Sequence, residues 1–231
     1  MLLDNKLYIP HLHPTVVKRS GLMEQLNKGL SCKLTLVAAQ AGYGKTTALS
    51  EWAQQCEAKV IWISLDRNDN DFFAFWRYVI AGMDKLRPGI AKLLDPILAT
   101  FASNAIEPFM IAILQQLHHV TDVWAIVWDD YHTIEDTAIH RSIAMLIDHL
   151  PSGIHVYLSS RSEVPFPTSR LLARSEMLRI DSSHLRFQMT ESMEFFQRHM
   201  KAALTREQVA THAIGDRGNR LVLDTYAQAL A

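Results

Sequence analysis

One short segment, Ala39-Gln-Ala-Gly-Tyr-Gly-Lys-Thr-Thr47, decides much of what this chain can fold into. Residues 33–39, KLTLVAA, form an apolar run rich in β-formers, and residues 46–55 have helical character. Strand, glycine-containing loop and helix, in this order, make a phosphate-binding loop, because consecutive backbone N–H groups and the positive end of the helix surround an anion. The segment therefore predicts a polyphosphate site at the end of a buried strand.

Each position of this loop has an expected role. Lys45 would bridge the β- and γ-phosphates, the Thr46 hydroxyl would ligate Mg²⁺, and Thr47 would contact the α-phosphate. The expected nucleotide-binding residues are Ala41, Gly42, Tyr43, Gly44, Lys45, Thr46 and Thr47. The pattern G-x-x-x-x-G-K-[ST] has glycine where this chain has Ala39. The structural alternative is a helix N-terminus that merely carries a lysine.

Two further strand ends carry candidate catalytic groups. The strand 123–128 is followed by Asp129, expected to hold Mg²⁺ through water, and by Asp130, expected to polarise the attacking water. The strand 154–159 is followed by Ser160, which could orient water, and by Arg161, which would reach the γ-phosphate. The alternative for Asp129 and Asp130 is a solvated acidic turn, and the alternative for Arg161 is a surface arginine at the end of a strand.

The rest of the chain alternates between strands and helices. Apolar runs at 60–65 and 177–180 predict two more strands, and amphipathic stretches predict helices at 20–30, 71–86 and 138–150, with two further helices within 90–119, parted near 104–108. This alternation predicts an α/β fold with a parallel five-stranded sheet flanked by helices. Because Val60–Leu65 lies between the loop strand and the aspartate strand in sequence, it suits the ATPase (ASCE) branch of P-loop folds, which has an added central strand.

The pattern changes near residue 187. From Thr190 onward only helices are predicted, at 191–200, 206–214 and 221–230. We therefore place a boundary there, with a nucleotide-binding domain at 1–187 and a helical subdomain beginning at 188–231.

Composition excludes several classes of function. Lys plus Arg (23) balance Asp plus Glu (24), so no large basic field is available and we expect no DNA binding by this chain alone. The two cysteines match neither a disulfide framework nor a metal motif and are expected to be buried or half-buried reduced thiols. The scattered histidines are expected to bind no metal. Without a signal peptide or an apolar run of about 20 residues, we expect a cytoplasmic protein with no membrane contact.

Several segments together resemble one family, the MalT-like, LuxR-type transcriptional regulators, which belong to the signal-transduction ATPases with numerous domains (STAND). The matching segments are Lys6–Pro10, Val17 with Arg19, 33–47, Trp62–Asp66 with Asp69-Asn70, Trp128–His132, Leu158–Arg161 and Leu185–Phe187. They span roughly residues 5–200, and their combination is specific although no single segment is.

The resemblance implies a regulatory mechanism. Val17 and Arg19 would lie against adenine and ribose, and the residues after 187 would begin a helical lid over the nucleotide. ADP would hold a closed monomer, whereas ATP and an unknown inducer or regulatory protein would favour an open form that self-associates until slow hydrolysis returns it to rest. The expected cofactors are ATP/ADP and Mg²⁺.

This sequence also departs from the family. Relatives carry a sensor of helical repeats and a helix-turn-helix that are not present in these 231 residues, and 215–220 fits poorly where relatives have a Gly-Trp pair. The chain is therefore either a fragment or a short gene product, and neither inducer sensing nor DNA binding is assigned to it.

Two other functions remain open. A P-loop kinase or other metabolic ATP-dependent enzyme would need lid arginines, for which Arg170 and Arg174 are the only candidates. A scaffold that binds nucleotide only for stability would not need the second carboxylate, Asp130. The missing Asn-Lys-x-Asp signature favours adenine over guanine.

Overall fold

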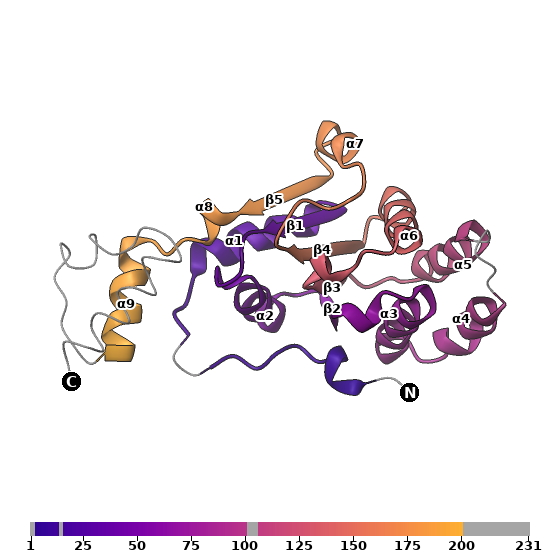
Figure 1. Ribbon diagram of the computed structural model, residues 1–231, viewed down its shortest axis with the longest axis horizontal. Coiled ribbons are helices and arrows are strands. Elements are labelled where there is room, and N and C mark those ends of the chain that lie inside the picture. Colours follow the sequence, from indigo (N-terminus) through magenta and orange to yellow (C-terminus); the bar gives the residue numbers. More distant parts are fainter. Residues whose placement is uncertain (1–2, 14–15, 101–105, 201–231) are drawn as a thin grey trace.

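The computed structural model describes residues 3–13, 16–100 and 106–200, and its centre is one sheet of five strands. The strands pair in the order β2-β3-β4-β1-β5, and every pairing is parallel (Figure 1). Their bounds are Leu34–Ala38 (β1), Lys59–Ser64 (β2), Trp124–Asp129 (β3), Ile154–Ser160 (β4) and Met177–Asp181 (β5). The predicted parallel five-stranded sheet is confirmed.

The sheet has the added central strand expected of the ATPase branch, because β4 lies between β1 and β3. The strand at 60–65, which lies between the other two in sequence, is β2 and lies at an edge of the sheet. Burial explains the placement: all seven residues of β4 are buried, whereas β2 begins with the exposed Lys59. Order along the chain does not determine order across a sheet.

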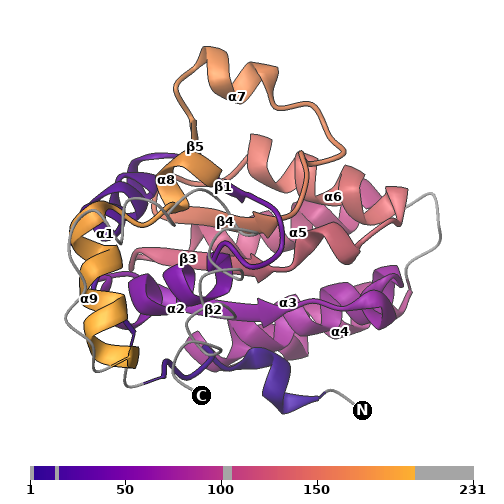
Figure 2. The same cartoon turned by 60° about the vertical axis from the view of Figure 1, so that its left-hand side comes forward.

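Helices cover both faces of the sheet (Figure 2). One face carries α1 (Ser20–Lys28) and α2 (Lys45–Gln55), and the other carries α3 (Phe72–Leu86), α4 (Ile90–Ala99), α5 (Ile106–His118) and α6 (Thr137–Asp148). Successive strand residues point to opposite faces. Trp62 thus joins the core under α1 and α2, whereas its neighbours Ile61 and Ile63 join the core under α3 to α6.

The aromatic residues of α3 form part of this second core. Phe75 and Trp76 have no exposed surface, and the Trp76 ring lies edge-on to Phe109 with centroids 5.5 Å apart. The indole N–H of Trp76 donates to Ser142 Oγ at 3.1 Å, so its polar atom is satisfied inside the core. These aromatic rings are therefore part of the core and not of a ligand site.

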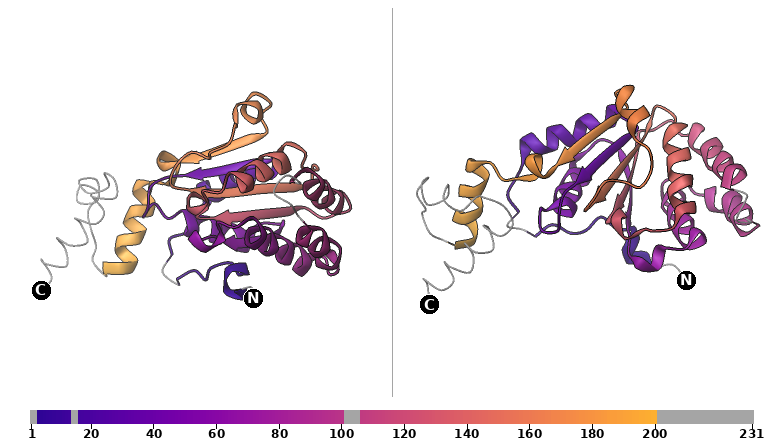
Figure 3. Two further views of the ribbon diagram at one scale, coloured as in Figure 1. Left: turned by 45° about the vertical axis from the view of Figure 1, so that its right-hand side comes forward. Right: turned by 45° about the horizontal axis from the view of Figure 1, so that its top comes forward.

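The chain leaves the sheet through β5. A short helix, α7 (Ser169–Ala173), precedes β5, and α8 (Ser182–Leu185) and α9 (Met189–Met200) follow it. In Figure 3, α9 lies beyond one end of the sheet, away from α3 to α6. The expected boundary at 187 falls between α8 and α9, and the helices expected at 206–214 and 221–230, like the 215–220 segment, lie outside the described residues. No helix in the described ranges is long and apolar enough to cross a membrane.

Candidate functional site

The loop between β1 and α2 has the conformation that a phosphate site needs. The chain turns at 41–43, and both Gly42 (φ 87°) and Gly44 (φ 74°) have left-handed backbone conformations that strain other residues. Gly44 is the N-cap of α2, so the first N–H groups of the helix face the loop. Ala41, Gly42 and Gly44 are exposed, Thr47 is exposed in the first turn of α2, and Tyr43 is half-buried. An anion can therefore reach this loop.

Ala39, which replaces the first glycine of the pattern, fits its position. It is only 7% exposed, and its methyl group belongs to the same core cluster as Val37 and Ala48. Among the described residues, only Asp130 and Ser175 are non-glycine residues with positive φ, so Ala39 has an ordinary backbone conformation. The loop consequently keeps its glycines where the backbone requires them.

The Lys45 side chain folds back over the loop. It is 6% exposed, and its ammonium group donates to the carbonyl oxygens of Ala39 at 2.7 Å and Gln40 at 2.9 Å. These contacts hold a positive charge above the turn that contains Gly42 and Gly44. Lysine here is a point charge suited to phosphate oxygens.

Thr46 and Asp129 lie side by side, as a magnesium site requires. The Thr46 hydroxyl donates to Asp129 Oδ2 at 2.9 Å, and Ser159 Oγ donates to Asp129 Oδ1 at 2.5 Å. Burial raises the pKa of Asp129, the Ser159 and Thr46 hydrogen bonds lower it, and the charge of Asp130 raises it; the net shift is upward. A cation would offset this buried negative charge, and hydroxyl and carboxylate oxygens are ligands that Mg²⁺ accepts. The residues therefore fit the expected ion.

Asp130 begins the loop after β3 and is held in an unusual conformation. Its backbone is left-handed (φ 58°, ψ 39°), and its N–H donates to Ser159 Oγ at 2.8 Å. Ser159 thus joins the two aspartates, a contact that the sequence did not predict. The Asp130 side chain is 45% exposed, which leaves it accessible to water, as a group that polarises water must be.

His132 lies beside Asp130 and is influenced by the charges of two other candidate residues. Its Nδ1 lies 3.7 Å from Asp130 Oδ1. Burial lowers the pKa of His132, Asp130 raises it, and the charges of Arg161 and Lys45 lower it; the net shift is downward. The charges of Lys45, Asp130 and Arg161 therefore all act on one imidazole. Sequence reasoning gave His132 no role beyond the family motif, although its place two residues after Asp130 was a usable signal.

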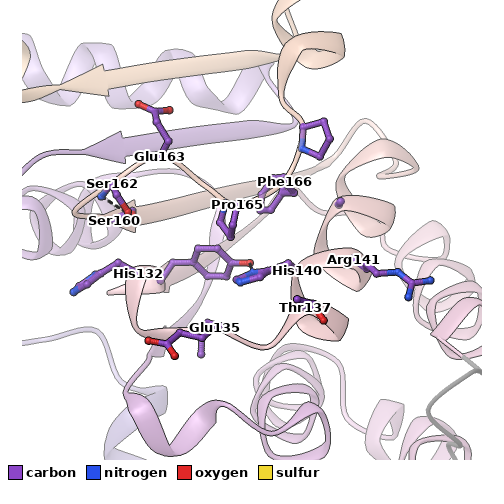
Figure 4. Close-up of a pocket in the computed structure, with 14 residues that line it drawn as sticks. His132, Glu135, Thr137, His140, Arg141, Ser160, Ser162, Glu163, Pro165 and Phe166 are labelled. Carbon is purple, nitrogen blue, oxygen red and sulfur yellow. Dashed lines mark hydrogen bonds between the residues drawn. The ribbon is translucent and has the colours of Figure 1, made fainter.

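A cavity of about 540 Å³ borders this cluster on the side of α6 (Figure 4). His132 and Ser160 line it, but no residue of the 39–47 loop does, so it is distinct from the phosphate site. Arg161 is exposed where the chain leaves β4. Ser160 is only 1% exposed, and its Oγ accepts from the N–H of Ser162 at 3.2 Å, which indicates a turn-forming role.

Three other residues discussed above have structural surroundings. Asp66 caps the turn after β2 and pairs with Lys6 at 2.8 Å. Cys32 and Cys56 are free thiols of intermediate burial, which confirms that expectation.

Arg19 binds protein groups at the junction of α8 and α9. Its guanidinium donates to the carbonyl oxygens of Leu185 at 3.0 Å, Arg186 at 2.8 Å and His184 at 3.4 Å. Its Nε lies 3.3 Å from Glu191 Oε2, and its Cζ lies 5.0 Å from the centre of the Phe187 ring. The side chain thus connects the start of α1 to the end of the described chain. Contact of Val17, which is 3% exposed, and of Arg19 with adenine stays a prediction.

We expect Arg19→Ala to loosen this junction without unfolding the sheet. Hydrogen bonds from a charged donor contribute about 1.5–3 kcal/mol each, so amide exchange in α8 and α9 should accelerate about 10- to 100-fold. Exchange in β1 and β4 should not change. Lys18→Ala, which alters an exposed neighbour, is the control. Equal exchange of residues 182–195 in both variants would contradict the assignment.

Comparison with known proteins is consistent with this geometry. No family model matches the chain. It is 28% identical over 181 residues to the serine/threonine-protein kinase PknK of Mycobacterium tuberculosis, covering 77% of this chain and 16% of that protein. It is 27% identical over 201 residues to the HTH-type transcriptional regulator MalT of Vibrio cholerae, and 28% identical over 204 residues to MalT of Yersinia enterocolitica. These matches cover 87% and 88% of this chain and 22% of each regulator.

A solved structure has the same fold. A STAND protein with a tetratricopeptide repeat sensor, from Pyrococcus horikoshii, superposes with a TM-score of 0.59 at 16% identity, covering 87% of this chain and 28% of that one. The chain thus spans less than a quarter of the curated relatives it matches. Together, the sequence matches and the shared fold support a MalT-like nucleotide-binding domain.

Proposed function

We propose that this MalT-like chain is the ATP/ADP-binding switch domain of a transcriptional regulator of the STAND class, with slow Mg²⁺-dependent ATP hydrolysis. One observation carries the proposal: Thr46, next to Lys45 at the start of α2, bonds Asp129 at the end of β3, directly before Asp130. This is the arrangement that places a polyphosphate, a cation and a water molecule at one edge of a parallel sheet.

Nucleotide binding follows from the loop. The N–H groups of 42–46 and the N-terminus of α2 would surround the β-phosphate, and Lys45 would turn from loop carbonyl oxygens toward phosphate oxygens. Thr46 and Asp129 would hold Mg²⁺, which neutralises phosphate charge when bound. ATP differs from ADP only in the γ-phosphate, so contacts from Lys45 and Arg161 to that group would distinguish the two states.

Hydrolysis would use Asp130. A water oxygen attacks the γ-phosphorus, the bond to the oxygen that bridges to the β-phosphate breaks, and ADP leaves. Asp130, which is 45% exposed, would orient this water and accept its proton. Arg161 would stabilise the negative charge of the transferred phosphoryl group. Because a regulatory ATPase must persist in its ATP state, we expect turnover to be slow.

The regulatory part of the proposal extends beyond the described residues. The segment 188–231 would form the start of a lid whose position depends on the nucleotide, joined to α1 through Arg19. An inducer or regulatory protein, and nucleotide-dependent self-association, would act on that arrangement.

The direct test is to identify the nucleotide retained by the purified protein. Tightly held ADP supports a switch, whereas an empty site that only turns over substrate supports the alternative of a P-loop kinase or other metabolic enzyme. Release of phosphate from ATP alone, compared with release in the presence of small acceptor molecules, distinguishes the two. A rate that rises with an acceptor would contradict the switch.

Asp129→Asn is expected to weaken magnesium dependence without destabilising the unliganded fold. The pKa of this carboxyl is raised in the folded state, so its ionisation opposes folding as pH rises above the unfolded value, and removing the charge at pH 7 removes no stabilisation. The unfolding temperature without nucleotide should therefore stay equal or rise. In the parent, ATP with Mg²⁺ should raise the unfolding temperature more than ATP with a chelator does, and this difference should disappear in Asp129→Asn. Asp122→Asn, at an exposed carboxylate, should keep both values.

A further inference from the structure

The turn after β2 is bonded directly to the loop that carries Asp130. Asn70 Oδ1 accepts from the backbone N–H groups of Glu135 at 2.5 Å and Asp136 at 3.2 Å. Asn70 Nδ2 donates to the carbonyl oxygen of Thr133 at 2.6 Å. One side chain thus satisfies three backbone groups of a segment more than 60 residues away in sequence.

Thr133, which Asn70 binds, is in turn bonded to Asp130, the proposed catalytic aspartate. Thr133 donates to the carbonyl oxygen of Asp130 twice, from its N–H at 3.0 Å and from Oγ1 at 2.9 Å. Asp130 has a left-handed backbone, which a non-glycine residue keeps only when its surroundings hold it there. Asn70 therefore anchors the far side of a short loop, residues 130–136, whose near side Ser159 anchors through the N–H of Asp130.

The turn that presents Asn70 is itself fixed from a distant part of the chain. Lys6, 8% exposed, places its ammonium 2.7 Å from Asp69 Oδ2 and 2.8 Å from Asp66 Oδ2. Asp69, 2% exposed, also accepts from the N–H of Asp66 at 2.8 Å, and Asp66 accepts from the N–H of Asn68. These bonds close the 3₁₀ turn Arg67–Asp69 directly before Asn70.

We infer that Asn70 is a positioning residue for hydrolysis, which holds residues 130–136 so that Asp130 and His132 face the nucleotide. The inference rests on the proposed function. An amide suits the task because it accepts from two N–H groups with its oxygen and donates to a carbonyl with its nitrogen. A carboxylate of the same size accepts equally well but repels the Thr133 carbonyl.

The inference is tested by Asn70→Ala and Asn70→Asp in the full chain, with Asn68→Ala, at an exposed asparagine of the same turn, as the control. We expect kcat for ATP hydrolysis to fall about 10- to 100-fold in both Asn70 variants, since small displacements of a catalytic group have effects of this size. KM for ATP and affinity for ADP should change less than about threefold, and Asn68→Ala should match the parent.

Amide exchange gives a readout that does not need turnover. The N–H groups of Glu135 and Asp136 should exchange faster in Asn70→Ala, while those of β3 keep their protection. Unchanged exchange in 130–136 overturns the inference. So does a kcat equal to the parent's, or a fall in kcat matched by an equal loss of ADP affinity and a lower unfolding temperature, which would indicate a structural role alone.

A double-mutant cycle tests the link to the N-terminal segment. Lys6→Met keeps the length of the side chain but removes the charge that pairs with Asp69. If Lys6 acts through Asn70, kcat should fall in Lys6→Met, and the double variant with Asn70→Ala should fall no further than Asn70→Ala. If the two losses of kcat multiply in the double variant, Lys6 does not act through Asn70. Failure of the proposed function itself would be recognised separately, because Lys45→Ala would then bind ADP as tightly as the parent.

Discussion

Lys45→Ala is expected to abolish measurable binding of ATP and ADP. The ammonium lies over the loop turn, where it can donate to two phosphates, and each charge-assisted hydrogen bond contributes about 1.5–3 kcal/mol. Losing two such contacts lowers affinity by about 100- to 10,000-fold. Calorimetry or the displacement of a fluorescent ADP analogue measures this loss directly.

The control for this variant is Lys59→Ala. Lys59 starts β2 at the opposite edge of the sheet, where it pairs with Asp122 and is 52% exposed, so it should bind nucleotide like the parent. Lys45→Ala loses its bonds to the Ala39 and Gln40 carbonyl oxygens but keeps the sheet, so circular dichroism should not change. Equal affinity of Lys45→Ala and the parent would end the assignment of a phosphate site.

Asp130→Asn is expected to separate binding from hydrolysis. The Asp130 side chain is 45% exposed, and it is Asp129, not Asp130, that accepts from Thr46, so nucleotide affinity should stay within about threefold. An amide cannot accept the proton of the attacking water, and a general base contributes about 100- to 10,000-fold to rate. Single-turnover release of phosphate from bound ATP should therefore slow by at least about 100-fold.

Glu135→Gln provides the matched comparison. It removes one carboxylate from the same loop at an exposed position and keeps the backbone N–H that binds Asn70. Hydrolysis in this variant should equal that of the parent. Were Asp130→Asn to hydrolyse ATP at the parental rate, another group would have to activate the water, and the role assigned to Asp130 would be wrong.

The phosphate loop and the two aspartates could be predicted because their signals are local. Gly42, Gly44 and Lys45 are specified by the backbone that a phosphate loop needs, and Asp129 by its place directly after an apolar strand. Parallel strands bring their carboxyl ends to one edge, so segments far apart in sequence meet there without further information. The contact between Thr46 and Asp129 follows from this rule.

Other parts of the site depend on partners that no local pattern reveals. Ser159 was assigned no role, yet it joins Asp129 and Asp130, because β4 inserts beside β3. Arg19 was expected near adenine and ribose from the resemblance, which stays a prediction, and no local pattern indicated that its guanidinium bonds carbonyl oxygens more than 160 residues away. These roles depend on packing, which periodicity does not report.

The sequence by itself determined the α/β class, the parallel sheet, the phosphate loop and the edge at which chemistry would occur, because backbone propensity and side-chain period act over a few residues. Only the tertiary structure decided that β4 separates β1 from β3, that His132 faces Asp130, and that Asn70 holds their loop. The place of β4 and the contact of Asn70 depend on which strand pairs with which, and that choice is made by burial summed over the whole chain.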